Sequence, residues 1–306
     1  MKAPETGRSS IRGPERLVTL ARWAVALLLA VGGGGALPAN ATPATTSPRT
    51  TTLTLDDTRT DADVYVPAGD PPIGVAIVAH GWTRSKAQHR DLGIALADAG
   101  VVAIVPDLPN VLDLRGNGTL VVELVGQLEA GGLGMPPTPR SSIVLIGTSA
   151  GGLATVHAAS KLPGLAGWIG LDPVDRTGTG IYAASELEAP AIVFVGDASA
   201  CNLFGSGRTI ARAAPHLVRM EKIAGASHCD FESPTSKFCT RLCGSATREK
   251  QDEILRDAVS ASVDLLRRTD RPYRPRRGPT DTVRSTLPPG DAGLEPEPDS
   301  ASAPEQ

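Results

Sequence analysis

A serine between glycines, in the run Gly147-Thr148-Ser149-Ala150-Gly151, carries the clearest chemical signal in this chain. The run follows apolar residues 142–146 and leads into a helix-like stretch. A G-x-S-x-G sequence between a strand and a helix is typical of a sharp turn that presents a nucleophilic serine at the end of a sheet. Glycine is needed there because a Cβ beside the strained serine would clash. We interpret Ser149 as a nucleophile, and the alternative is a helix start capped by Ser149.

A nucleophilic serine needs a general base, usually a histidine that follows both the serine and an orienting acid in the chain. Only two of the five histidines, His216 and His228, follow Ser149 at a useful distance. His216 precedes the apolar run at 217–223, which places it at the wrong end of a sheet. His228 follows that run, so we expect His228 to be the base. The alternative is a surface histidine beside a disulfide.

The orienting acid has three candidates that follow strand-like runs, Asp172, Asp175 and Asp197. After the later run, a triad acid usually stands three residues beyond a glycine, but the position three residues beyond Gly196 holds Ser199. Asp172 stands at the tip of the earlier run, and Pro173 restricts the turn beyond it. We favour Asp172. Each aspartate could instead cap a turn or a helix.

The developing oxyanion of an acyl-transfer reaction needs two backbone N–H donors. Ala150, directly after the serine, is expected to supply one donor. Trp82 is expected to supply the other, because His80-Gly81-Trp82-Thr83 follows the first central strand. The indole of Trp82 would then form an apolar wall of the substrate cleft. We expect His80 to have a structural role in this loop.

Alternating apolar runs and helix-like stretches between residues 50 and 269 predict one α/β domain with a mostly parallel sheet and helices on both faces. Two antiparallel edge strands are expected at 51–55 and 64–66. Expected central strands lie at 75–79, 101–105, 142–146, 165–171, 191–195 and 217–223, and expected helices at 86–99, 121–128, after Ser149 and at 249–268. Residues 176–190 are too few for a large lid domain. We therefore expect an open cleft bordered by Trp82 and by Leu112 or Ile181.

Both ends of the chain differ in composition from this domain. A basic leader, an apolar run at 23–31 and Ala39-Asn40-Ala41 predict a signal peptide over residues 1–41, with cleavage near Ala41 and secretion. An uncleaved anchor is the alternative. Residues 42–49 are expected to be a flexible linker, and residues 270–306 a disordered Pro-rich tail.

An even number of cysteines in a secreted chain predicts disulfides, here among Cys201, Cys229, Cys239 and Cys243. Three pairings are possible, and we favour Cys201–Cys229 with Cys239–Cys243. Zinc is the alternative, although the spacing is irregular, and we expect no metal and no cofactor. Residues 1–41 hold five of the 30 basic and two of the 33 acidic residues, so the remainder has a net charge of −6 (25 − 31). Because the domain has no basic cluster in its sequence, we expect no nucleic-acid partner. We also expect no stable membrane insertion of the mature chain, and a monomer.

Four segments together resemble the α/β-hydrolase superfamily, and more narrowly its chlorophyllase-like and dienelactone-hydrolase-like esterases, which include secreted polyester hydrolases and cutinase-like enzymes. They are Ala79-His80-Gly81-Trp82, Val105-Pro106-Asp107-Leu108, Gly147–Gly152 and Gly170-Leu171-Asp172-Pro173-Val174. The D-P-V sequence of chlorophyllase-like proteins implies Asp172 as the acid. Gly81-Trp82-Thr83 is similar to the G-Y-T sequence of polyester hydrolases, which implies that Trp82 donates its backbone N–H and contacts the substrate. Those enzymes also have a disulfide that reaches the residues next to the catalytic histidine, and Cys229 follows His228 directly.

The chain also departs from these relatives. Chlorophyllases have G-H-S-R-G-G at the elbow, where this chain has Thr148 and Ala150, and Ser199 occupies the acid position of polyester hydrolases. The resemblance implies a secreted serine hydrolase that cleaves carboxylic esters of a small molecule, lipid or polymer through an acyl-enzyme. The alternatives are an acyltransferase, an amidase, or a non-catalytic binding protein on the same scaffold.

Overall fold

The computed structural model describes residues 48–270 except residues 56, 70 and 111. The expected signal peptide, most of the expected linker and nearly all of the expected tail lie outside these residues. The first strand begins at Arg49, one residue before the expected start of the domain.

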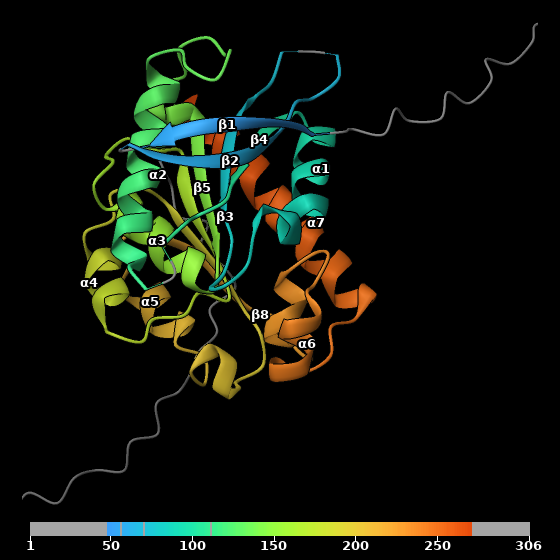
Figure 1. Ribbon diagram of the computed structural model, residues 1–306. Helices are drawn as coiled ribbons and strands as arrows, with labels where there is room; N and C mark the ends of the chain where they lie inside the picture. Colours follow the sequence, from blue (N-terminus) through green and yellow to red (C-terminus); the bar gives the residue numbers. More distant parts are fainter. Residues whose placement is uncertain (1–47, 56, 70, 111, 271–306) are drawn as a thin grey trace, which may run out of the picture. The chain divides into compact units, whose positions relative to one another are not determined.

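One eight-stranded sheet forms the centre of the described body, in the order β1-β2-β4-β3-β5-β6-β7-β8 (Figure 1). The first two strands and β4 pair antiparallel, and all later neighbours pair parallel. This confirms the predicted α/β class. Two antiparallel strands precede the parallel ones as expected, but the second begins at Thr58 rather than at residue 64, and it lies between β1 and β4 rather than at the edge of the sheet. The strands are β1 (Arg49–Leu55), β2 (Thr58–Tyr65), β3 (Gly74–Ala79), β4 (Val101–Pro106), β5 (Ile143–Thr148), β6 (Gly167–Leu171), β7 (Ala191–Val195) and β8 (Leu217–Lys222).

Burial explains why the central strands are continuous apolar runs. Every residue of β3, β4, β5, β6 and β7 is buried, because helices cover both faces of the sheet. By contrast, β1 alternates buried and exposed residues toward its end, as expected for a strand with one solvated face. On one face, Trp168 of β6 is fully buried and its indole N–H donates to Thr155 Oγ1 at 3.0 Å.

Helices pack in two layers. One face of the sheet is covered by α2 (Leu114–Glu129), α3 (Ala150–Ala159), α4 (Thr179–Ser185) and α5 (Gly207–Ala213), and the other by α1 (Arg90–Asp98) and α7 (Arg248–Leu266). The helix expected at 121–128 begins earlier, because Asp113 caps it through the N–H of Gly116 at 2.8 Å. The segment 176–190 contains only α4, so no large lid covers the described domain.

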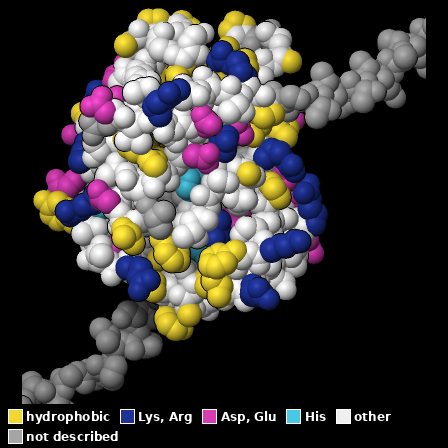
Figure 2. Space-filling view, viewed as in Figure 1, with side chains coloured by type: hydrophobic (Ala, Val, Ile, Leu, Met, Phe, Trp, Pro, Cys, Tyr) yellow, Lys and Arg dark blue, Asp and Glu magenta, His cyan; other side chains and the backbone are white. Residues whose placement is uncertain are grey.

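Two short elements, α6 (Lys237–Cys243) and the 3₁₀ turn η4 (His228–Phe231), follow the last strand. In Figure 1, α6 lies at the lower end of the body, and Figure 2 shows hydrophobic side chains gathered at that end with Lys and Arg on either side. None of the described helices is both long and apolar enough to cross a membrane.

The disulfides correct the favoured pairing. Cys201 is bonded to Cys243 and Cys229 to Cys239, so the expected Cys201–Cys229 and Cys239–Cys243 pairs were wrong. The reason is that α6 packs beside η4 and also beside the 3₁₀ turn η3 (Ala200–Asn202), so each cysteine of α6 bonds to a different segment. Three of these sulfurs lie within 4.8 Å of one another, but oxidised sulfurs offer no thiolate to zinc.

Candidate active site

Ser149 stands at the sharp turn between β5 and α3. Its backbone has φ 54° and ψ −121°, an unfavourable conformation for a residue with a Cβ. Four backbone hydrogen bonds hold it there: its N–H donates to Leu171 O at 3.1 Å, and its carbonyl accepts from Gly152 N at 3.0 Å, Val174 N at 3.1 Å and Leu153 N at 3.4 Å. The surrounding backbone therefore stabilises the strained turn, which lies between a strand and a helix as expected from the sequence.

Close packing explains the glycines of the turn. A Cβ on Gly151 would overlap the carbonyl oxygens of Ala79 and His80, and a Cβ on Gly147 would overlap the carbonyl of Gly151. These neighbours are backbone atoms, which cannot move aside as a flexible side chain would. The turn thus requires glycine at both positions.

His228 lies at the start of η4 with both ring nitrogens engaged. Its Nε2 is 3.0 Å from Ser149 Oγ, and its Nδ1 is 2.6 Å from Asp172 Oδ2. The turn that carries it is fixed by Asp230, which accepts from Ser227 N at 2.7 Å and Thr247 N at 2.6 Å. The structure therefore brings the three predicted residues, Ser149, His228 and Asp172, into one hydrogen-bonded chain.

Asp172 is fully buried at the end of β6, where nearby donors stabilise its carboxylate. Oδ1 accepts from Gly196 N at 3.1 Å, and Oδ2 accepts from the side-chain amide of Asn202 at 3.1 Å. Hydrogen bonds to a charged carboxylate favour that charged form. An ionised Asp172 can accept the Nδ1 proton of His228, which leaves Nε2 free to accept a proton from Ser149.

The two competing aspartates are occupied elsewhere. Asp175 accepts from Gly180 N at 2.8 Å and Ile181 N at 3.1 Å, which makes it the cap of α4. Asp197 is exposed, and its hydrogen bond with Lys222 lowers the pKa of its carboxyl group. Among the described contacts, neither reaches His228.

Asn202 is a site residue that sequence reasoning missed. It is fully buried, its amide donates to Asp172 and to Asp197 O, and its Oδ1 accepts from Ser199 N at 2.9 Å and Gly205 N at 3.0 Å. The only sequence signal is the spacing of Ser199 and Asn202, which forms a capping box at η3. That spacing predicts a local turn but not a contact with Asp172.

The loop after β3 brings Trp82 beside the serine. His80 Nδ1 donates to Gly81 O at 2.8 Å and Nε2 accepts from Leu108 N at 2.8 Å, while burial lowers the pKa of His80 and keeps it neutral. A Cβ on Gly81 would lie only 3.2 Å from Ser149 Cβ, so this backbone passes directly over the turn. Ala150 opens α3, where the first N–H groups have no partner within the helix.

A buried ion pair closes one side of the site. Arg84 Nε is 2.6 Å from Glu232 Oε1, with only 9% and 4% of the two side chains exposed. The same guanidinium reaches Trp82 O at 3.4 Å and lies over the ring of Phe238 at 5.2 Å. Arg84 thus connects the loop of Trp82 to η4 and α6, a link that sequence reasoning also missed.

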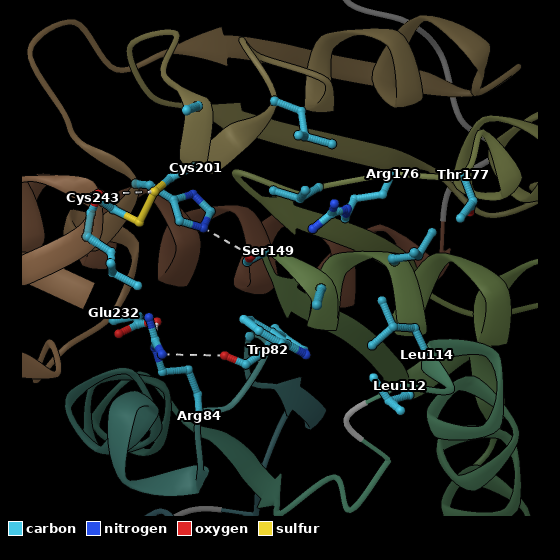
Figure 3. A pocket seen from close by; sticks show the side chains of 18 of the residues that line it. Trp82, Arg84, Leu112, Leu114, Ser149, Arg176, Thr177, Cys201, Glu232 and Cys243 are labelled. Atoms are coloured by element: carbon cyan, nitrogen blue, oxygen red, sulfur yellow. Dashed lines mark hydrogen bonds and ion pairs between the residues drawn. A yellow bond between two sulfur atoms is a disulfide. The ribbon is translucent and has the colours of Figure 1, made fainter. Parts of the chain in front are cut away.

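A cavity of about 730 Å³ opens over Ser149. Figure 3 shows Ser149 between the Cys201–Cys243 disulfide and Arg176, with Trp82 along one wall. Leu112 lines the cavity as expected, whereas Ile181 is not among the lining residues because it lies on α4 beyond the Asp175 cap. The volume is that of a site for a medium-sized organic molecule.

Comparison with known proteins bears on the fold alone. No protein-family model and no curated protein matches the chain. Among solved structures, a dienelactone hydrolase from Anabaena variabilis ATCC 29413 matches with a TM-score of 0.52 and 16% identity, over 73% of this chain and 98% of that one. The chain has the α/β-hydrolase fold.

Proposed function

We propose that this α/β-hydrolase-fold protein is a serine hydrolase that cleaves carboxylic esters. The observation that carries the proposal is the hydrogen-bonded chain from Ser149 Oγ through His228 to Asp172, with the serine in a strained turn below an open cavity. A serine, a histidine and a buried carboxylate in this geometry are the parts of an acyl-transfer catalyst.

The reaction would run in two halves. Ser149 Oγ attacks the ester carbonyl while His228 Nε2 takes its proton, and the N–H groups of Ala150 and Trp82 stabilise the oxyanion. His228 then protonates the departing alcohol, which leaves an acyl group on Ser149. A water molecule, activated by His228, attacks that ester and releases the acid. Asp172 keeps the imidazole in the required tautomer throughout, and no step requires a metal or cofactor.

The open cavity favours hydrolysis over transfer to another alcohol, because water can reach the acyl group directly. An amidase would use the same residues and remains a second candidate. Secretion is part of the proposal. It is supported by two disulfides, which persist in oxidising compartments, and by the leader sequence. N-terminal sequencing of protein from a secreting host should begin at Thr42.

The test is release of p-nitrophenol from a series of short to medium acyl esters. Wild type should be active, Ser149→Ala should lose the activity, and Ser185→Ala, an exposed serine on α4, should retain it. A fluorophosphonate should label only Ser149, as read by peptide mass spectrometry. Folded, oxidised protein that shows neither turnover nor labelling would refute the proposal and favour a binding role.

A further inference from the structure

Apolar side chains surround the mouth of the cavity, although they face solvent. Five of them line the cavity and are between 37% and 93% exposed: Trp82, Leu112, Leu203, Phe238 and Leu242. We call these five the apolar rim. Phe204, beside Leu203, adds a sixth side chain that is 74% exposed. Single exposed apolar residues are ordinary, but a contiguous group around one opening indicates a binding surface.

The charge around the mouth is opposite to that of the whole chain. The segments that border it (82–84, 112–115, 174–179, 200–208 and 237–243), together with Glu232, which also lines the cavity, hold six basic residues and three acidic ones, whereas the whole chain has a net charge of −3. Of the six, Arg84 is held in the buried ion pair with Glu232. The other five are Arg115, Arg176, Arg208, Lys237 and Arg241. We call these five the basic flank.

Most of this positive charge is available to a partner. Both acids of these segments cap helices, Asp113 for α2 and Asp175 for α4. Within the described part of the chain, none of the five residues of the basic flank forms a salt bridge. Arg115 and Arg176 are exposed at the cavity, and Figure 3 shows Arg176 beside its opening.

α6 presents both kinds of side chain on a rigid support. Phe238 and Leu242 stand one turn apart, 50% and 61% exposed, with Lys237 and Arg241 next to them in the helix. The two disulfides tie α6 to η3 and η4, so little ordering is needed when a partner binds. Apolar side chains that enter an interface beside basic ones are typical of proteins that bind negatively charged membranes.

We propose that the apolar rim and basic flank dock the protein on an anionic lipid surface, with the cavity mouth toward the lipid. The rim side chains enter the acyl boundary while the basic flank lies against phosphate groups. The substrate part of this inference rests on the proposed esterase function: the site would take apolar esters from that surface. Docking itself does not require turnover.

Vesicle flotation tests the docking on the Ser149→Ala variant, so the result is independent of hydrolysis. The protein is purified from a secreting host and mixed with phosphatidylcholine vesicles, with or without about one third phosphatidylglycerol. We expect binding to the anionic vesicles, weakened by salt, and little binding to the neutral ones. Equal binding to both, or binding to neither, would overturn the proposal. Binding to a soluble polyanion but not to vesicles would overturn it in favour of a polymeric partner.

Two double variants separate the contributions. Arg115→Gln with Arg176→Gln should weaken binding to anionic vesicles roughly 30-fold, at about fivefold for each basic residue. Phe238→Ser with Leu242→Ser should weaken it as well, whatever the salt concentration. Lys161→Gln with Arg256→Gln removes the same charge from exposed positions on other elements and should change binding less than twofold. Circular dichroism of each variant checks the fold. If the Lys161 and Arg256 control loses as much binding as the Arg115 and Arg176 variant, the assignment of the charge contribution to the basic flank is wrong.

Discussion

Asn202 donates its side-chain amide to the carboxylate of Asp172, with 3.1 Å between Nδ2 and Oδ2, and both side chains are fully buried. The same carboxylate oxygen lies 2.6 Å from His228 Nδ1. Asn202 therefore helps to position the carboxylate that contacts the histidine, and it also closes its own loop through Ser199 and Gly205.

Asn202→Asp should change the pH dependence of the reaction. A second carboxylate beside Asp172 favours positive charge on His228, so the acid limb of the kcat/KM profile should move to higher pH, with kcat lowered about tenfold or more. Rates between pH 5 and pH 9 on a p-nitrophenyl ester check this. An Asn202→Ala variant that lowers the melting temperature but leaves the profile and kcat unchanged would show that the residue only supports the loop.

Gly151→Ala should destabilise the turn, because its Cβ would overlap two backbone carbonyl oxygens. We expect a loss of about 1–3 kcal/mol in the free energy of unfolding, together with loss of activity. Gly126→Ala is the matched control: it lies inside α2 with no atom within 4 Å of a new Cβ. It should stabilise the protein by about 0.5–1 kcal/mol. Urea unfolding measures the free energy of unfolding of both variants. Equal changes in the two variants would contradict the packing argument.

His89 should make the fold sensitive to acid. It is buried, and burial lowers the pKa of its imidazole from 6.5 to about 3. The unfolded chain binds a proton below pH 6.5 that the folded chain rejects, so stability is complete above that pH and falls between pH 6.5 and pH 3. Each pH unit costs about 1.4 kcal/mol within that window. Urea unfolding at pH 7 and pH 4.5 should show the loss, and His89→Phe should show a smaller one; the same loss in the variant would assign it to other groups.

The two disulfides should differ in their contribution to stability. Cys201–Cys243 spans 42 residues and Cys229–Cys239 spans 10. Loop-closure entropy predicts losses of about 4 and about 3 kcal/mol when each pair is replaced by serines. Cys229 is next to His228, so its pair should also affect turnover more. Denaturant curves and rates test both statements, and a non-reducing peptide map should recover these pairs and no others.

Local sequence signals were sufficient for much of the fold. Residues 143–146 of β5 are a continuous apolar run because both faces of this strand are buried, so the run predicts a buried strand. The glycines around Ser149 predict the turn, because the steric crowding that requires them acts within five residues of the chain. The start of α2 was harder to predict because glycines at 116 and 118 lower its helix propensity, while a cap and tertiary packing restore it.

The sequence by itself determined the α/β architecture, the elbow serine and the histidine beyond the last strand, because periodicity, chain order and local sterics carry that information. Only the tertiary structure brought Asp172, rather than Asp175 or Asp197, against His228. It also placed Asn202 beside Asp172, joined Arg84 to Glu232 and paired the cysteines. These contacts connect residues 10 to 148 positions apart. Their partners are chosen by how strands and loops meet at one edge of the sheet, which no local pattern encodes.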